Sequence, residues 1–429
     1  MNARTFLFLQ GPASPFLRLL AEALEARGQT VRRINFSMGD AVFWWPKQGD
    51  WFRDRRGAWR AHLASYVKTH SVTDLVMLGD GRPVHAVAAE LGIDDGLRVH
   101  ILEHGYLRPD WLTIEPDGMS AHSRFPRDPD AIRTLAGDTA KVDTGRLFRS
   151  SFLTYALFDL AYHIPNVALG WLVHRHYRTH GPVHPVVEYA GWISKALTRR
   201  ARQAKARTAI AGWSAASPEK RYLFPLQLPG DYQILQHAPG GDLFSIVDAV
   251  IQSFARHAAP DASLLFKVHP LDNGLSRWPQ RIKATSERCR VGGRVFLADG
   301  GDTDRLIDLS TGVVVVNSTV GLTAIAAAKP VIALGAAIYD VPGLSFQGSL
   351  EQFWKGAAAP DMALFDAFNR ALAVTTQVRG GFIGREALRV GVNNVAERLM
   401  EDSDRLDISL RRPRDQKFFR HERELFNLD

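Results

Sequence analysis

Two short motifs in the second half of this sequence combine residue types that bind phosphate. One is a Lys-x-His-Pro turn and the other is an Asn-Ser-Thr-x-Gly stretch leading into small residues; together they contain Lys267, His269, Pro270, Asn317, Ser318, Thr319 and Gly321. A lysine supplies charge, a histidine ring supplies a donor, and the first turn of a helix presents unpaired amides. The combination predicts a binding site for the phosphate of a nucleotide. Each motif also has a simpler explanation, because Ser and Thr commonly cap helices and His-Pro commonly forms a turn.

Two acidic residues are candidates for catalysis. Glu103 ends an apolar stretch and is followed by His104, Gly105 and Arg108, whose guanidinium can form paired hydrogen bonds with a carboxylate or a phosphate. Asp231 follows a Pro-Gly turn. The structural alternatives are a Glu-Arg pair that closes a loop and an exposed turn aspartate. We favour function for both, because each follows a predicted strand.

The apolar pattern around these residues indicates the strands that position them. Unbroken Val, Leu and Ile runs at residues 264–266, 313–316 and 330–334 are typical of buried parallel strands, since a half-exposed strand would alternate. Ligands of open α/β sheets bind at the carboxyl ends of strands. Both phosphate motifs follow such runs, so we expect their polar residues at that edge of a sheet.

The first part of the chain predicts a second α/β arrangement. Strands are expected at residues 5–9, 30–35, 74–78 and 98–102, and helices at 16–27, 59–68 and 83–91. Residues 39–51, with adjacent tryptophans and a proline, fit no regular element and are interpreted as an aromatic loop. A length of 429 residues with 46% hydrophobic content provides for two α/β domains.

Residues 148–192 interrupt this alternation with a helical segment rich in aromatic residues, which we interpret as a buried or interfacial insertion. Its most apolar part, residues 152–173, is broken by Asp159, His163 and Pro165, so no span long enough to cross a bilayer is expected. The first residues predict a strand rather than a signal peptide. A single cysteine, Cys289, excludes a disulfide framework and a cysteine-built metal site, and fits a reducing compartment.

The basic residues give a formal net charge of +8 and concentrate at residues 199–207 and 411–423. Such an excess suggests an anionic partner. No nucleic-acid motif or stacking platform is present, so nucleic acid is not expected as a partner. Phe418 and Phe419 beside basic residues favour an anionic membrane surface. A solvated, charged helix end is the alternative.

Five motifs in order resemble one family. FLQGP near the start, EHGYLRPDW, PLQLPGDYQ, KVHP and NSTVGL are similar to the capsule polysaccharide biosynthesis and export family, specifically the Kps-type Kdo transferases. The resemblance runs from about residue 6 to beyond residue 335. Glu103-His104-Gly105 stands where two-module relatives have Glu-Asp-Gly, so the single-module form is the closer match.

The resemblance implies a glycosyltransferase of GT-B architecture, with two Rossmann-like domains facing a cleft. We expect an N-terminal acceptor domain at 1–212 with a helical insertion at about 148–205, a CMP-sugar domain at 213–392, and a C-terminal helix and basic tail at 393–429. CMP-Kdo would be the donor and a phosphatidylglycerol-type lipid at the inner face of the cytoplasmic membrane the acceptor. Capsule assembly proteins would be partners. The substrate-binding residues implied are Gln10, Gly11, His104, Arg108, Gln227 and His237.

The implied reaction retains the anomeric configuration and starts a β-Kdo linker. Asp231 is our candidate nucleophile and Glu103 the candidate base, although the two roles are interchangeable on this information. The leaving CMP phosphate needs its charge neutralised more than it needs a proton. No metal or other cofactor is expected, because Asp302-Thr303-Asp304 has the spacing of a metal motif but opens a helix and is interpreted as its cap.

Two other kinds of function remain open at this point. One is a different nucleotide-sugar enzyme, such as a sialyltransferase-like transferase or an epimerase. The other is a non-catalytic scaffold of capsule export. The presence of both a predicted phosphate-binding site and two candidate catalytic carboxylates, Glu103 and Asp231, favours an enzyme.

Overall fold

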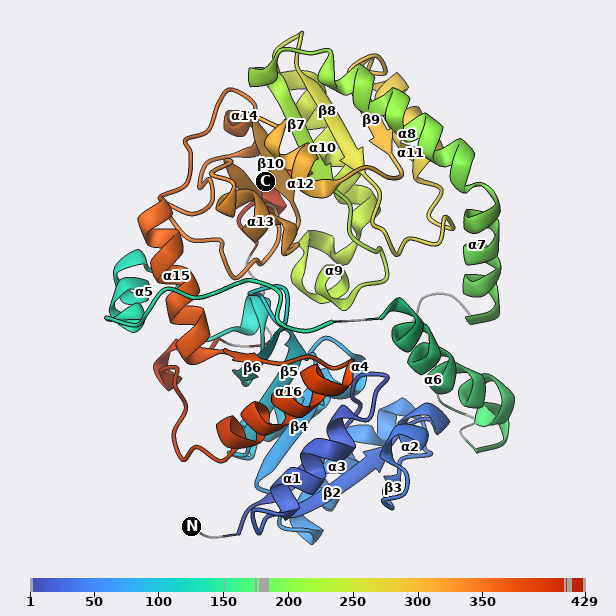
Figure 1. Ribbon diagram of the computed structural model, residues 1–429, viewed down its shortest axis with the longest axis vertical. Helices are drawn as coiled ribbons and strands as arrows, with labels where there is room; N and C mark the ends of the chain where they lie inside the picture. The colour runs from blue at the N-terminus through green and yellow to red at the C-terminus, as the bar shows by residue number, and fades with distance from the viewer. Residues whose placement is uncertain are drawn as a thin grey trace. The chain divides into compact units, whose positions relative to one another are not determined.

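The computed structural model describes residues 3–149, 151–173, 176, 185–412, 414 and 419–426. The chain forms two compact units (Figure 1). Unit 1 comprises Met1–Phe125, Leu135–His180 and Asn369–Gln416, and unit 2 comprises Pro126–Thr134, Gly181–Phe368 and Lys417–Asp429. Each unit has its own sheet of mainly parallel strands, so the predicted α/β class and the two Rossmann-like units are confirmed.

Unit 1 has a seven-stranded sheet in the order β12-β6-β5-β4-β1-β2-β3. Its strands are β1 (Thr5–Phe8), β2 (Thr30–Asn35), β3 (Asp50–Trp51), β4 (Asp74–Leu78), β5 (Arg98–His104), β6 (Trp111–Pro116) and β12 (Gln377–Arg379). Strands β1 to β5 run parallel to one another, whereas β6 is antiparallel to both β5 and β12. The order of the parallel strands is that of a Rossmann fold, and it reverses direction between β1 and β4.

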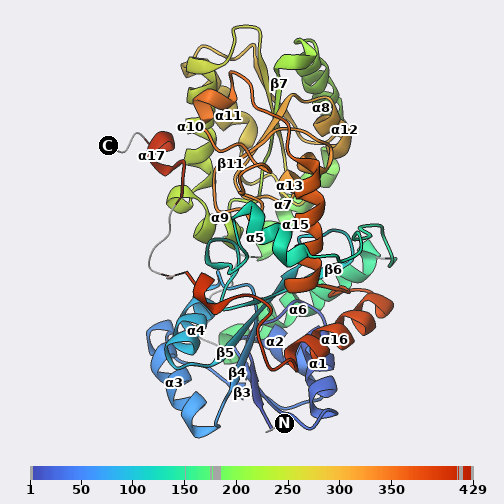
Figure 2. The same cartoon turned by 90° about the vertical axis from the view of Figure 1, so that its left-hand side faces the viewer.

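Helices cover both faces of this sheet. Unit 1 contains α1 (Phe16–Glu25), α2 (Met38–Trp44), α3 (Trp59–Thr69), α4 (Pro83–Asp94), α6 (Phe152–Val173) and α16 (Arg385–Leu399). The α1 and α16 helices pack together on one side of the sheet and α3 and α4 on the other (Figure 2). Phe8, Leu20 and Val395 are fully buried in the core beneath α1 and α16.

Unit 2 has a five-stranded sheet, all parallel, in the order β11-β10-β7-β8-β9. Its strands are β7 (Arg221–Pro225), β8 (Ser263–Lys267), β9 (Val295–Ala298), β10 (Gly312–Val315) and β11 (Val331–Ala333). Every residue of β8, β10 and β11 is buried, which confirms the interpretation of the three unbroken apolar runs. This sheet repeats the Rossmann order and reverses direction between β7 and β10.

The helices of unit 2 include both long packing helices and short ones at the sheet edge. They are α7 (Pro185–Leu197), α8 (Arg199–Ser214), α9 (Tyr232–His237), α10 (Leu243–His257), α11 (Trp278–Arg288), α12 (Thr303–Asp308), α13 (Val320–Ala326), α14 (Leu350–Phe353) and α17 (Glu422–Phe426). The α10 helix packs against α11, α14 and α17, and α8 packs against β8 and β9. Asp302 accepts hydrogen bonds from the amides of Asp304 and Arg305 at the start of α12, so its predicted role as a cap is confirmed.

The boundaries between the two units lie at residues other than the predicted domain boundaries. The chain enters unit 2 after residue 180 rather than near 212, because α8 belongs to the second sheet: the buried Trp213 donates from Nε1 to the carbonyl of Tyr222 at 3.1 Å. It returns to unit 1 at residue 369, inside α15 (Met362–Thr375), rather than near 392. The α5 helix (Pro129–Ala136) also spans a boundary.

The segment interpreted as an aromatic loop contains a helix, and that prediction is wrong. Ser37 accepts the amide of Asp40, and Asp40 accepts the amide of Ser37, so the two residues form a capping box that starts α2. A capping box satisfies two orphan amides of the first turn. Trp44 at the end of α2 is buried, whereas the following Trp45 is 75% exposed.

The basic C-terminal segment is largely neutralised where the structure describes it. In unit 1, Arg411 Nε lies 2.6 Å from Asp117 Oδ2 and Arg414 Nη2 lies 3.0 Å from Asp80 Oδ2. In unit 2, Arg420 pairs with Asp340 at 3.2 Å and Phe419 is buried. Phe418 lies outside the described residues. The interpretation of this tail as an exposed membrane-binding segment is therefore wrong for the described part.

Candidate functional site

The reversal point of the unit 2 sheet carries a pair of side-chain amides. Gln227 follows β7 and Asn317 follows β10, so both lie at the carboxyl ends of neighbouring strands. Gln227 Nε2 donates to Asn317 Oδ1 at 2.8 Å, and the Asn317 amide donates to Gln227 Oε1 at 3.3 Å. Two residues predicted for substrate and donor binding are thus in direct contact.

Asn317 also holds the short helix α9 in place. Its Nδ2 donates to the carbonyls of Gln233 and His237, at 2.8 and 3.1 Å. Asp231 caps the same helix by accepting the Gln233 amide at 2.9 Å. The predicted nucleophile therefore has a structural role at the start of α9, and the cap fixes the orientation of its carboxylate.

The Asn-Ser-Thr-x-Gly motif begins α13, as expected for a strand-to-helix turn. Ser318 Oγ accepts the Val320 amide at 3.2 Å, and the Gly321 amide donates to the Ser318 carbonyl at 3.0 Å. Several of the amides predicted to be open to phosphate are thus already satisfied locally. A side chain at position 321 would overlap Tyr339, so glycine is required for close packing rather than for ligand approach.

Lys267 and His269 lie one strand away, after β8. Lys267 is buried, which lowers the pKa of its ammonium, and Asp299 and Asp302 oppose that effect. Asp299 also pairs with Lys195 at 3.6 Å and with Arg202, from the basic cluster at 199–207, at 2.6 Å. Lys267 therefore belongs to a mixed-charge cluster rather than standing as a lone cation.

His269 accepts a hydrogen bond from the backbone. The Leu271 amide donates to its Nδ1 at 3.1 Å, so a neutral ring carries its proton on Nε2. That tautomer fits the predicted role as a ring donor. Pro270 follows it in an exposed turn, which the Asp272 amide closes on the His269 carbonyl at 2.9 Å.

The reversal point of the unit 1 sheet is charged. The buried Gln10, after β1, donates from Nε2 to Asp40 Oδ2 at 3.0 Å. Asp40 also accepts the amides of Phe36 and Ser37, both at 3.0 Å, and lies 3.6 Å from Arg33. Burial lowers the pKa of Arg33, and the Asp40 carboxylate opposes that shift.

A small pocket, with a cavity volume of about 10 Å³, adjoins these residues. It is lined by Gly11, Pro12, Ser14, Leu17, Arg33, Gly39, Asp40, Phe43, Trp44 and Tyr162. Gly11 is required here because a side chain would overlap Leu17 of α1. The predicted substrate residue Gly11 therefore lines this pocket, which α2 and α6 close, and Gln10 adjoins it through its hydrogen bond to Asp40.

Glu103 lies at the carboxyl end of β5 and is half-buried. Burial raises the pKa of its carboxyl, while the His104 amide and the charges of Arg82 and Arg108 oppose that rise. Its Oε2 faces Gly79, at the end of the neighbouring strand β4. A carboxyl with a raised pKa at a strand end is a candidate for proton transfer.

The two other residues predicted beside Glu103 are exposed. The His104 ring packs edge-on against Phe382, with centroids 5.0 Å apart. Arg108 donates from Nε to the Gly105 carbonyl at 3.2 Å, which closes the turn. Both residues therefore have structural contacts and an exposed surface.

Three charged residues of unit 1 were missed by the sequence analysis. Asp40 could have been found from Ser37-x-x-Asp40, which is a capping signature, whereas Arg33 carries no such local signal. Arg82 follows the turn after β4, in the position that Arg108 takes near β5. Its Nη1 is buried and has no hydrogen-bond partner among the described residues.

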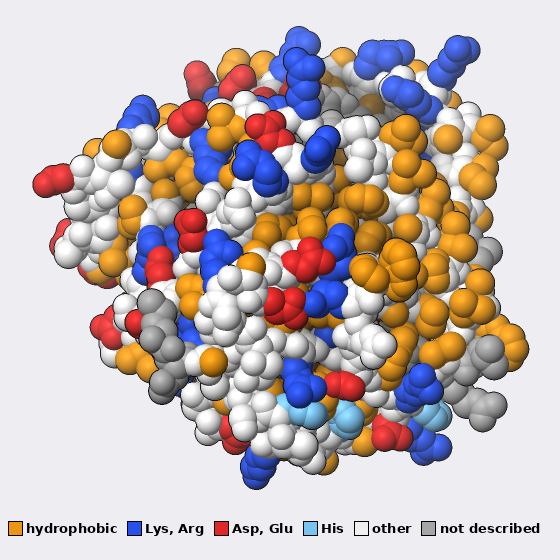
Figure 3. Space-filling view, turned by 60° about the horizontal axis from the view of Figure 1, so that its bottom comes forward, with side chains coloured by type: hydrophobic (Ala, Val, Ile, Leu, Met, Phe, Trp, Pro, Cys, Tyr) orange, Lys and Arg blue, Asp and Glu red, His pale blue; other side chains and the backbone are white. Residues whose placement is uncertain are grey.

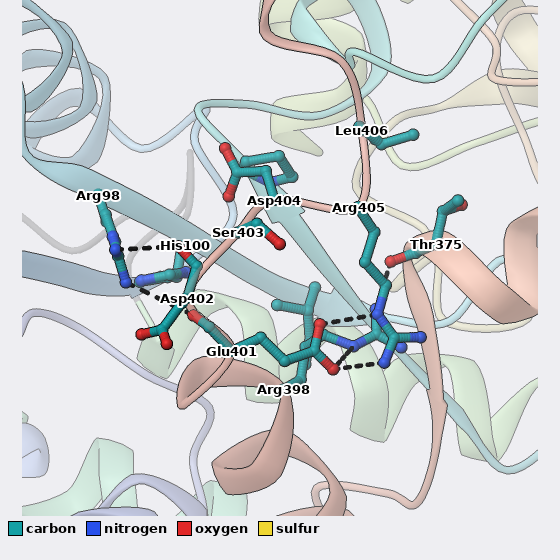
Figure 4. A pocket seen from close by; sticks show the side chains of 12 residues that line it. Arg98, His100, Thr375, Arg398, Glu401, Asp402, Ser403, Asp404, Arg405 and Leu406 are labelled. Atoms are coloured by element: carbon teal, nitrogen blue, oxygen red, sulfur yellow. Dashed lines mark hydrogen bonds and ion pairs between the residues drawn. The ribbon is translucent and has the colours of Figure 1, made fainter. Parts of the chain in front are cut away.

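A larger pocket in unit 1 lies at the opposite edge of the sheet and is structural. Figure 4 shows Arg98 and His100 from β5 beside the segment after α16. Arg405 pairs with Glu401, and Arg98 donates to the Asp402 carbonyl at 3.1 Å. His100 Nε2 lies 2.8 Å from Asp74 Oδ1. Burial alone would raise the pKa of Asp74, but hydrogen bonds from His100 and Arg4 lower it to about 2. These ionic groups neutralise one another.

Comparison with known proteins identifies the family. The sequence profile of the capsule polysaccharide biosynthesis protein family matches residues 73–383. The chain belongs to this family. The matched segment contains Glu103, Asp231 and both phosphate motifs, whereas Gln10 and Gly11 precede it.

Individual members of this capsule polysaccharide biosynthesis family match most of the chain. The capsule polysaccharide export protein KpsS of Escherichia coli is 30% identical over 383 residues, covering 88% of this chain and 96% of KpsS. The capsule polysaccharide modification protein LipB of Neisseria meningitidis serogroup B is 30% identical over 393 residues, covering 89% and 92%. A solved structure of KpsC, a β Kdo 2,7 transferase from Thermosulfurimonas dismutans, aligns with a TM-score of 0.45 at 14% identity, over 92% of this chain and 99% of that one.

The predicted site residues thus gather at two reversal points, one in each unit. Gln10 and Gly11 lie at that of unit 1, with Glu103 on the neighbouring strand end, and Gln227, Asn317, His237 and Asp231 lie at that of unit 2. Glu103 and Asp231 belong to different units, so their pairing stays a prediction.

Proposed function

We propose that this protein transfers Kdo from CMP-Kdo to a phosphatidylglycerol-type lipid, with retention, and so starts the β-Kdo linker of a capsular polysaccharide. Membership of the capsule polysaccharide biosynthesis family supports the biological setting. The observation that carries the chemistry is the Gln227–Asn317 pair that holds α9 and its Asp231 cap at the reversal point of unit 2.

Unit 2 would bind the donor. Side-chain amides can recognise the edge of a cytosine without adding charge. The departing CMP phosphate would accept hydrogen bonds from His269 Nε2 and from the hydroxyls of Ser318 and Thr319, and the ammonium of Lys267 would offset its charge. Preorganised donors of this kind stabilise charge as it develops on a leaving group.

Unit 1 would bind the acceptor at the cytoplasmic face of the membrane. Arg82 has a buried nitrogen without a partner among the described residues, and Arg108 is exposed, so both are suited to the phosphate of a lipid headgroup. Burial raises the pKa of Glu103, and the charges of both arginines oppose that rise. Its raised pKa suits a base that takes the proton of the acceptor hydroxyl.

The proposed reaction has two displacements. An Asp231 oxygen attacks the anomeric carbon, and CMP leaves with the electron pair of the broken bond. The acceptor hydroxyl then attacks the same carbon, the bond to Asp231 breaks, and Glu103 receives the hydroxyl proton. Two inversions give retention. The roles of the two carboxylates remain interchangeable, and no metal or other cofactor takes part in the scheme.

The decisive experiment incubates the purified protein with CMP-Kdo and a fluorescent phosphatidylglycerol. We expect a new glycolipid and release of CMP. Asp231→Asn keeps an N-cap acceptor but removes the carboxylate, so transfer is lost while stability is kept; Asp231→Ala loses both. If Asp231→Asn transfers Kdo at the wild-type rate, the nucleophile assignment is wrong.

The same assay separates the alternative functions. Glycolipid formation from another CMP-sugar, but not from CMP-Kdo, would indicate a different transferase of the sialyltransferase-like kind. A protein that consumes no nucleotide sugar, while Asp231→Asn and Glu103→Gln variants still support capsule production, would indicate a scaffold.

A further inference from the structure

One face of α6 is an uninterrupted apolar stripe open to solvent. It consists of Leu153, Leu157, Leu160, Ile164, Val167 and Trp171. Their spacing alternates between four and three residues, which places all six on one side of a helix. Their exposed fractions range from 37% for Leu160 to 73% for Trp171.

The opposite face of α6 is fixed on α2. Phe158 packs edge-on against Phe43, with ring centroids 5.6 Å apart. The buried Tyr162 donates to Asp40 Oδ1 at 3.2 Å, and Asn166 Oδ1 accepts the Gly39 amide at 2.7 Å. The outward direction of the stripe is therefore set by tertiary contacts on its other side.

The chemistry around the stripe fits a lipid surface. The stripe has no charged residue, and the helix's Asp159 lies off it, 3.7 Å from His163. Trp171 ends the stripe, and the exposed Trp45 follows α2; tryptophans prefer the boundary between acyl chains and headgroups. Figure 3 shows apolar side chains gathered over the right-hand part of the face that includes α6.

Exposed cations precede the helix. Arg146 and Arg149 lie within six residues of Phe152, and both are exposed, as is Leu147 between them. Cations at the edge of an apolar helix face attract anionic lipids, at about 1 kcal/mol each near the surface. This complementarity favours an anionic bilayer over a neutral one.

We propose that α6 lies in the plane of an anionic membrane and buries the Leu153-to-Trp171 stripe among the acyl chains. The proposal rests on the lipid acceptor of the proposed function and names the surface that reaches it. Tyr162, on the other side of the same helix, lines the pocket beside Gln10. Docking through α6 would thus bring lipid headgroups to the acceptor side of unit 1.

Vesicle flotation tests the surface independently of catalysis. We expect the full-length protein to float with phosphatidylglycerol-containing vesicles and much less with pure phosphatidylcholine. The variant Leu157→Glu/Ile164→Glu should bind at least about tenfold more weakly, because two charges would enter the apolar layer. The matched control Ile408→Glu/Leu410→Glu changes two exposed apolar residues elsewhere in unit 1 and should bind as the wild type does.

A fluorescence measurement locates the contact. In a Cys289→Ser background, an environment-sensitive dye on Leu160→Cys should brighten and shift to the blue on adding phosphatidylglycerol vesicles. The same dye on Ile408→Cys should not respond. Equal flotation of the stripe variant and the wild type, or no response at position 160, would overturn the proposal. A dimer in solution that the stripe variant dissociates would instead assign the stripe to a second copy.

Activity assays separate this proposal from the proposed function. If both hold, the stripe variant keeps transfer to a short-chain, monomeric phosphatidylglycerol and loses transfer to vesicles. If no transfer occurs with any acceptor but the stripe variant alone loses vesicle binding, the membrane surface holds and the proposed function fails. If transfer occurs and vesicle binding does not depend on the stripe, the reverse is true.

Discussion

The two sheets share one strand order but differ in the chemistry at their reversal points. In unit 2 the point between β7 and β10 is bridged by neutral amides, Gln227 and Asn317. In unit 1 the point between β1 and β4 holds ionic groups, with Asp40 against Arg33. A second carboxylate, Glu103, lies on the next strand.

The difference suits the two units to different tasks: unit 2 to ligand recognition by neutral amides, and unit 1 to proton transfer by charged groups. A neutral amide pair satisfies its own hydrogen bonds and can exchange them for those of a ligand at little desolvation cost. Buried charges are costly and persist only when they are paired. A unit that keeps them next to a pocket is suited to charged ligands and proton transfer. We therefore expect unit 1 to be the more sensitive of the two to charge-removing substitutions and to pH.

The largest effect is expected for Glu103→Gln. Loss of a general base lowers transfer by about 10²- to 10⁴-fold. In the wild type, burial raises the pKa of Glu103, so activity should fall as pH falls through that pKa, and the variant should lose this limb of the profile. Glu115→Gln, which changes another buried glutamate of unit 1, is the control and should keep its activity at pH 7. Similar losses in both variants would contradict a specific role for Glu103.

Asp40→Ala should strongly destabilise unit 1. Removing one partner of a buried ion pair costs about 3–5 kcal/mol, because Arg33 is left unpaired. Thermal and urea unfolding should show this loss in the transition of unit 1. The double variant Arg33→Met/Asp40→Leu, which removes both charges, should recover much of it. If Asp40→Ala lowered the free energy of unfolding by no more than Asn317→Ala does, unit 1 would not be more sensitive than unit 2 to the removal of a polar group.

Glu115→Gln should change how stability depends on pH. Burial raises the pKa of Glu115 to about 7, despite hydrogen bonds from Ser123 and Tyr106. The neutral carboxyl of Glu115 is thus favoured in the folded protein. Its contribution to the free energy of unfolding is complete below the pKa that Glu115 has in the unfolded chain, and it is lost as pH rises through about 7. At pH 9 the variant should be more stable than the wild type by about 3 kcal/mol, and the difference should vanish below about pH 4. Parallel stability curves would show that Glu115 does not titrate in this range.

The smallest effect on stability is expected for Asn317→Ala. The loss of hydrogen bonds to the carbonyls of Gln233 and His237 should cost about 1–3 kcal/mol and loosen α9. KM for the donor should rise, with little change in its pH dependence. Asn394→Ala removes a comparable bond, 2.9 Å to the Arg379 carbonyl in unit 1, and should leave KM unchanged. An equal rise in KM for both variants would indicate a general loss of stability.

Local pattern determined the strands and the residues at their ends. The buried runs in β8, β10 and β11 are continuous in sequence, and burial on both faces leaves that signature wherever a strand lies in the interior of a parallel sheet. The polar motifs after these strands and the Asp302 cap are equally local. For this reason the two α/β units and the polar carboxyl ends of the unit 2 strands could be predicted from sequence, whereas the order of the strands could not.

Tertiary structure decided which residues meet across long stretches of chain. The Gln227–Asn317 contact joins residues 90 positions apart, and the Arg414–Asp80 pair joins residues 334 apart. An exposed arginine and an ion-paired one look the same in sequence, so the tail was misjudged. The stripe on α6 was likewise hidden, because a helix apolar on several faces does not reveal which face its neighbours cover. Only the packing of Tyr162 and Asn166 on α2 decides that Leu157 and Ile164 face outward.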